Sequence, residues 1–202
     1  MSLFVRLNPK TMMANNLFRI TPPKRTYAGP ELNPYQKYKS ILEIDFNKRC
    51  GYTDCNQVWF GGKRSFHIDH FKPKSKFPEL STKYSNLVYS CSYVNIAKSD
   101  DISDYLDPVT IDYNEHFFRD NSGNIYPADD SPTAKYMHIK LKLYLKRYSI
   151  IFMLEKIRNK MTETKILIES INNQIDKTRL LAIQGELANE FLDYLKYLEV
   201  EQ

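Results

Sequence analysis

The stretch that decides the fold is Phe66-His67-Ile68-Asp69-His70-Phe71-Lys72-Pro73-Lys74-Ser75, and two shorter stretches follow it. They are Asn86-Leu87-Val88-Tyr89-Ser90-Cys91 and Asn95-Ile96-Ala97-Lys98-Ser99-Asp100. The carboxylate of Asp69 and the amide oxygen of Asn95 are hard ligands of the kind that Mg²⁺ or Mn²⁺ prefers. The imidazole of His70 is a base that works near neutral pH. An Asp-His pair at the end of an apolar strand, with an Asn on a following helix, therefore indicates metal-assisted chemistry.

Together these stretches resemble the ββα-metal core of the HNH endonucleases. The resemblance covers residues 50–100 and rests on the Asp69-His70 pair, on Pro73, on the Asn-Leu-Val strand from Asn86 and on Asn-x-x-Lys from Asn95. It implies an α+β protein in which residues 33–130 form a nuclease core with an acidic extension.

The resemblance implies a role for each residue that matches the motif. Asp69 and Asn95 are expected to hold one Mg²⁺ or Mn²⁺ ion, which acts as Lewis acid and template in phosphodiester hydrolysis. His70 is expected to be the general base that activates water. Asn86 matches an asparagine that steadies the loop and orients this base.

Basic residues around the motif are expected to contact the DNA phosphates. Lys98 matches a phosphate-binding residue of the family, and Lys72 and Lys74 follow the Asp-His pair directly. His67 lies two residues before Asp69, on the same face of the strand. A second metal ligand and a phosphate contact are both compatible with that position.

Charge is divided unevenly along the 202 residues. Residues 1–99 carry 16 Lys+Arg against 6 Asp+Glu, a balance of +10, so the remainder must sum to −5 to give the net charge of +5. The basic half contains the Asp-His motif, which favours a polyanionic ligand such as DNA, although a solvated basic surface is the alternative. The sequence predicts neither a membrane span nor a secretory signal, and three cysteines, an odd number, favour the cytoplasm.

The cysteines depart from the family pattern. Many relatives carry two C-x-x-C pairs, whose four thiolates hold a structural zinc ion. Here Thr53 stands three residues after Cys50, where the second cysteine of the first pair would lie, and Cys55 is displaced by two residues. Val94 stands at the corresponding position three residues after Cys91. Three thiolates could hold a zinc ion only with a fourth donor from elsewhere in the chain. The favoured interpretation is therefore that Cys50 and Cys91 are buried remnants of a lost site, which makes a structural zinc ion doubtful.

The N-terminal half is predicted to contain three further features. Residues 1–32 read as a basic arm that contacts DNA, docks on a partner or stays disordered. Its basic residues are Arg6, Lys10, Arg19, Lys24 and Arg25. A helix is predicted from an Asn33 N-cap to about Lys48, and a hairpin over residues 58–68 around Gly61-Gly62. A short helix bearing Asn95 is expected to be capped by Ser90 or Ser92.

Residues 100–130 carry nine Asp+Glu against Arg119 alone and are expected to lie away from DNA. Residues 121–124 are predicted to form a turn between two apolar runs. Residues 131–202 are predicted to be a helical partner or oligomerisation region, with its break at residues 176–178. Its two apolar stripes are Ile150, Leu154, Ile157, Met161, Thr164, Ile168, Ile171 and Ile175, and then Leu180, Ile183, Leu187, Phe191, Leu195 and Leu198.

Among HNH proteins the order of elements resembles the nuclease subunits of bacterial anti-phage cassettes, especially the Septu type. The shared features after the core are Asp107-Pro108, the Tyr113–His116 stretch and a helical tail. This narrower resemblance implies an ABC-like ATPase partner, and a homo-oligomer is the other arrangement considered. A non-catalytic nucleic-acid-binding or adaptor subunit is the rival function, and a stand-alone restriction or homing enzyme is a third. His116 and His138 are assigned no role.

Overall fold

The computed structural model describes residues 17–200, which form two compact units with an α+β fold. The first unit comprises the described residues up to Asn121 together with Ile125–Tyr144. The second comprises Ser122–Asn124 and residues 145–200, whereas the sequence placed the start of the helical region at residue 131. Between residues 17 and 200, no helix has the length and apolar character needed to cross a membrane.

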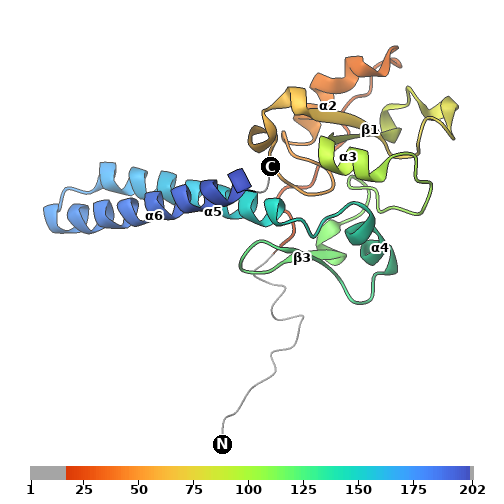
Figure 1. Ribbon diagram of the computed structural model, residues 1–202. Coiled ribbons are helices and arrows are strands. Elements are labelled where there is room, and N and C mark those ends of the chain that lie inside the picture. The colour runs from red at the N-terminus through yellow and green to blue at the C-terminus, as the bar shows by residue number, and fades with distance from the viewer. Residues whose placement is uncertain (1–16, 201–202) are drawn as a thin grey trace, which may run out of the picture. The chain divides into compact units, whose positions relative to one another are not determined.

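The centre of the first unit is a strand-strand-helix arrangement (Figure 1). β1 (Phe66–His70) pairs antiparallel with β2 (Leu87–Cys91), in a register that places Asp69 opposite Val88. α3 (Ser92–Lys98) follows β2 directly. The predicted strand and helix are confirmed, but the residue at the N-cap is Cys91, without a side-chain cap. The Ser90 hydroxyl instead donates to the Cys91 carbonyl.

The predicted hairpin over residues 58–68 is wrong. Gln57–Phe60 form a 3-10 turn, because the Asn56 side chain accepts a hydrogen bond from the Val58 amide and Gly61 ends the turn with φ of 89°. A second 3-10 turn, Lys63–Ser65, leads into β1. Residues 57–60 therefore form their backbone hydrogen bonds within the turn and do not pair with β1. The partner of β1 is the distant strand β2.

The described part of the predicted basic arm, residues 17–32, is packed within the first unit. The Arg19 side chain is buried, donates to the carbonyls of Gly51 (2.6 Å) and Pro108 (3.2 Å), and lies over the Tyr113 ring. Arg25 forms an ion pair with Asp107 at 3.0 Å. These two arginines are used inside the protein, and the predictions for Arg6 and Lys10 lie outside the described residues.

Around this centre lie the other elements of the first unit. A 3-10 turn (Tyr35–Tyr38) continues into α2 (Lys39–Asp45), but Asn33 does not cap it, because the N-cap position is Pro34. β3 (Phe117–Arg119) pairs antiparallel with β4 (Ile125–Pro127), which confirms the predicted turn. α4 (Pro132–Lys140) begins where the Ser131 hydroxyl accepts from the Ala134 amide.

The second unit is a helical hairpin of α5 (Lys146–Ser170) and α6 (Gln174–Val200), which lie side by side (Figure 1). The hairpin is confirmed, but the chain turns at residues 171–173 rather than 176–178. Ile150, Leu154 and Ile157 are buried as predicted, whereas Ile175 and Ile183 are exposed.

Candidate active site

A pocket of about 310 Å³ opens where the end of β1 meets α3. Four of the residues predicted from the sequence line it, namely Asp69, His70, Lys74 and Asn95. The other lining residues are Tyr35, Ile68, Pro73, Ser75, Ser99 and Asp100. The pairing of β1 with β2, and the helix that follows β2, thus bring together residues that are far apart in the sequence.

Asp69 is held by two buried donors. Its side chain is almost fully buried, with Oδ2 accepting from the Tyr52 hydroxyl at 2.6 Å and Oδ1 from the Lys98 ammonium at 3.1 Å. Burial raises the pKa of the Asp69 carboxyl, and the charge of Lys98 and the Tyr52 hydrogen bond offset part of that rise. The carboxylate is therefore fixed in orientation and locally neutralised.

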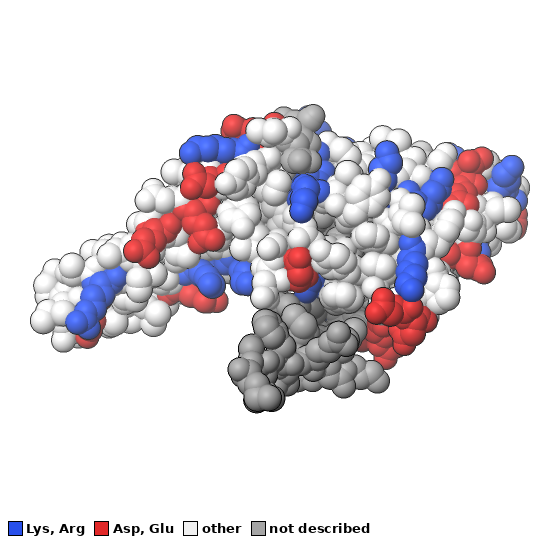
Figure 2. All heavy atoms as spheres, turned by 60° about the horizontal axis from the view of Figure 1, so that its bottom comes forward, with Lys and Arg blue, Asp and Glu red and all other residues white. Residues whose placement is uncertain are grey.

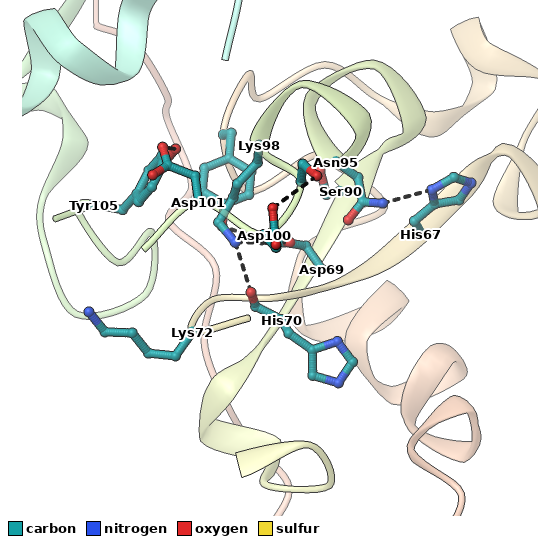
Figure 3. Close-up of polar contacts among 12 residues, drawn as sticks. His67, Asp69, His70, Lys72, Ser90, Asn95, Lys98, Asp100, Asp101 and Tyr105 are labelled. Atoms are coloured by element: carbon teal, nitrogen blue, oxygen red, sulfur yellow. Dashed lines mark hydrogen bonds and ion pairs between the residues drawn. The ribbon is translucent and has the colours of Figure 1, made fainter. Parts of the chain in front are cut away.

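Asn95 is oriented by His67. Its side-chain Nδ2 donates to His67 Nδ1 at 3.1 Å (Figure 3). Because an amide nitrogen can only donate, His67 Nδ1 carries no proton in this contact and Asn95 Oδ1 is left as an acceptor. His67 is not among the residues that line the pocket. Its observed contact is with Asn95, and its roles as a second metal ligand or a phosphate contact stay predictions.

His70 turns its ring to the side of the strand opposite Lys98 (Figure 3). Nε2 lies 2.9 Å from the Ser81 carbonyl and the ring packs edge-on against Tyr35, with centroids 4.6 Å apart. A carbonyl only accepts, so Nε2 carries the proton and Nδ1 keeps its lone pair. Burial lowers the pKa of His70 below its ordinary 6.5, against the opposing effect of the Ser81 hydrogen bond. The ring is thus neutral, and available as a base, at neutral pH.

Asn86 closes the loop between β1 and β2. Its side chain accepts from the Lys72 amide at 2.8 Å and donates to the carbonyls of Lys72 (2.9 Å) and Leu80 (3.2 Å). Leu80 ends the 3-10 turn Pro78–Leu80, and the next residue, Ser81, supplies the carbonyl that bonds His70. Asn86 therefore occupies the loop-steadying position that the sequence indicated.

The three lysines expected at the phosphates differ in their placement. Lys98 has no exposed surface, and its ammonium also donates to the His70 carbonyl at 2.8 Å. A phosphate cannot reach it in this structure, so Lys98 is an internal partner of Asp69. Lys74 is exposed at the pocket, while Lys72 is half-buried and does not line it. On the face shown in Figure 2, basic side chains are scattered among acidic ones rather than gathered in one patch.

The sequence assigned no site role to Asp100 and Tyr35, which line the pocket, or to Tyr52, which contacts Asp69. Asp100 lines the pocket, although it belongs to the acidic segment expected to lie away from DNA. Its position directly after Asn95–Lys98 is the signal that could have found it. Tyr35 and Tyr52 come from segments before β1, and nothing in their local sequence indicates that they reach the site.

All three cysteines are buried and free. Burial opposes ionisation of the Cys50 thiol, but hydrogen bonds from Cys91 and Thr53 lower its pKa to about 6. The pKa of the buried Cys91 thiol is raised well above its usual value. Among residues 17–200, no three His, Cys, Asp or Glu side chains are grouped so as to hold a metal ion.

In comparisons with known proteins, no family model, no curated protein and no solved structure matches this chain.

Proposed function

We propose that this protein is a metal-dependent HNH endonuclease that hydrolyses phosphodiester bonds in DNA. The observation that supports the proposal is that Asp69, His70 and Asn95, to which the resemblance assigns metal binding and catalysis, line one pocket. The order β1, β2, α3 is also that of a ββα-metal core. In this assignment the two strands and the helix are the scaffold that places the three side chains.

The donors at the pocket fit a hard divalent cation. Asp69 offers a carboxylate and Asn95 an amide oxygen that is not used by His67, and Asp100 adds an exposed carboxylate to the lining. Mg²⁺ is commonly held by one or two carboxylates with water and substrate phosphate as further ligands. Asp69 and Asn95 would hold the ion, which would supply Lewis acidity at the phosphate when bound.

His70 supplies the general base in this assignment. Its Nδ1 lone pair is free to take a proton from water because Nε2 is committed to the Ser81 carbonyl. Tyr35 covers one side of the ring, and Lys74 lies at the same pocket, 5.2 Å from the centre of the Tyr35 ring. Lys74 is therefore the lysine best placed to attract a phosphate toward His70.

A non-catalytic nucleic-acid-binding subunit is the second candidate. The observation that favours it is the Lys98 ion pair, since both oxygens of Asp69 already accept hydrogen bonds from protein donors. In that case Asp69 would be a structural carboxylate and DNA would bind without being cut.

Plasmid nicking separates the two candidates. The wild-type protein should nick DNA with Mg²⁺ or Mn²⁺ and stop on addition of EDTA. His70→Ala should lower the rate by about 10²–10⁴ while leaving DNA binding intact. His116→Ala is the matched control, because His116 contacts Ser131 and does not line the pocket. Nicking by His70→Ala at the wild-type rate would refute the assignment, and DNA binding without nicking by the wild type would favour the adaptor.

We infer that the biological role is that of an effector nuclease in anti-phage defence, on the sequence resemblance alone. The helical hairpin is the proposed partner surface.

The two helices of the hairpin differ in charge. α5 carries 6 Lys+Arg against 3 Asp+Glu, and α6 carries 3 Lys+Arg against 5 Asp+Glu. Because the basic helix of one copy can face the acidic helix of another, a second copy of this chain is the partner favoured here over an ATPase. Exposed apolar residues on the hairpin include Ile166, Leu181 and Leu192.

A further inference from the structure

Tyr52 contacts Asp69, the buried carboxylate that lines the pocket. Its side chain has no exposed surface, and its hydroxyl donates to Asp69 Oδ2 at 2.6 Å. Tyr52 belongs to a tight turn before β1, in which the Cys50 amide donates to the Cys55 carbonyl and the Gly51 amide to the Tyr89 carbonyl. The backbone that carries the phenol is thus fixed to β2 by bonds that do not involve Asp69.

The two donors to Asp69 bond different oxygens of its carboxylate and together restrain its rotation. The terminal torsion of an aspartate is broad and roughly two-fold, so a single donor leaves the carboxylate free to rotate. Lys98 bonds Oδ1 through a long chain, whereas Tyr52 bonds Oδ2 from a rigid ring.

We propose that Tyr52 is a positioning residue of the cation site, whose hydroxyl holds the Asp69 carboxylate in the rotation that faces the pocket. This inference rests on the proposed function, since it gives Tyr52 a role toward the ion that Asp69 and Asn95 would bind. Partners that orient a metal ligand commonly change metal affinity by about 10–100-fold when they are removed. Tyr52 itself is not among the residues that line the pocket.

The test is Mn²⁺ binding to the full-length protein without DNA, measured by the electron paramagnetic resonance signal of free Mn²⁺. Tyr52→Phe removes the hydroxyl and keeps the ring, and should weaken binding by about 10–100-fold. Tyr89→Phe is the matched control, because Tyr89 is equally buried but its hydroxyl donates to Gln57. Tyr89→Phe should bind Mn²⁺ like the wild type, and circular dichroism checks that both variants fold.

Each outcome decides the inference. Wild-type affinity in Tyr52→Phe, or an equal loss in Tyr52→Phe and Tyr89→Phe, would show that Tyr52 is only a packing residue, while the proposed function would stand. A wild-type protein that neither binds Mn²⁺ nor nicks DNA would overturn both. If Tyr52→Phe does not fold, 4-aminophenylalanine at position 52, which keeps the ring and an N–H donor at the place of the hydroxyl, should bind within about 10-fold of the wild type. Loss of binding by the folded 4-aminophenylalanine variant would overturn the inference.

Discussion

Replacing Lys98 with Met should destabilise the first unit strongly, because it removes the charge that compensates a buried carboxylate. At the 3.1 Å separation of Lys98 Nζ and Asp69 Oδ1, the gross attraction is about 5 kcal/mol at an effective dielectric constant of about 20. Removing one partner of a buried pair typically costs about 3–5 kcal/mol, because the other charge stays buried. The His70 carbonyl also loses its donor. We expect Lys98→Met to lower the free energy of unfolding by about 3–5 kcal/mol.

The assay is equilibrium unfolding in urea followed by fluorescence. Trp59 is the one tryptophan of the sequence and lies in the first unit, so its emission reports that unit and not the helical hairpin. Lys74→Met is the control, because Lys74 is exposed, and it should leave the midpoint unchanged. A loss below about 1 kcal/mol for Lys98→Met would refute the reasoning, since exposed pairs give values of that size.

The same variant has a pH signature. Burial raises the pKa of Asp69, and loss of the Lys98 charge should raise it further. A carboxyl whose pKa is raised in the folded state contributes stability that is present at low pH and is lost as the pH rises through that pKa. The difference in unfolding free energy between wild type and Lys98→Met should therefore shrink as the pH falls from 7 toward about 4. A constant difference would mean that Asp69 is not the group responsible.

Three other predictions concern catalysis, the cysteines and the hairpin. Burial lowers the pKa of His70, so the neutral form of its ring is present above that pKa and is lost as the pH falls through it. The nicking rate should therefore fall on the acid side with a midpoint below pH 6.5, and a midpoint above pH 6.5 would contradict this. Purified protein should contain little zinc, and elemental analysis that finds one tightly held zinc per chain would show that Cys50 and Cys91 have further ligand partners. Leu181→Ser with Leu192→Ser should convert a dimer to a monomer in light scattering with unchanged circular dichroism, whereas equal masses would count against the self-association surface.

The sequence by itself determined the strands, helices and turns that are encoded by short-range patterns of apolar and turn-forming residues. The alternation that ends in Asp69-His70 and the apolar run from Leu87 predict β1 and β2, and the a/d spacing from Ile150 predicts α5. The turn between β3 and β4 follows from its Asn and Gly residues. Asp69, His70 and Asn95 were also singled out from the sequence, and the structure places all three at one pocket.

Tertiary structure alone decided which partners these elements take. Residues 57–60 resemble a strand, yet β1 pairs with the distant β2, because strand pairing is settled by non-local packing rather than by propensity. The same holds for charge. In the sequence Arg19 and Lys98 cannot be told apart from exposed basic residues. In the structure each is buried and donates to acceptors from segments far along the chain. Tyr52 reaches Asp69 for that reason too, since the contact exists only after the turn that carries Tyr52 has docked against β2.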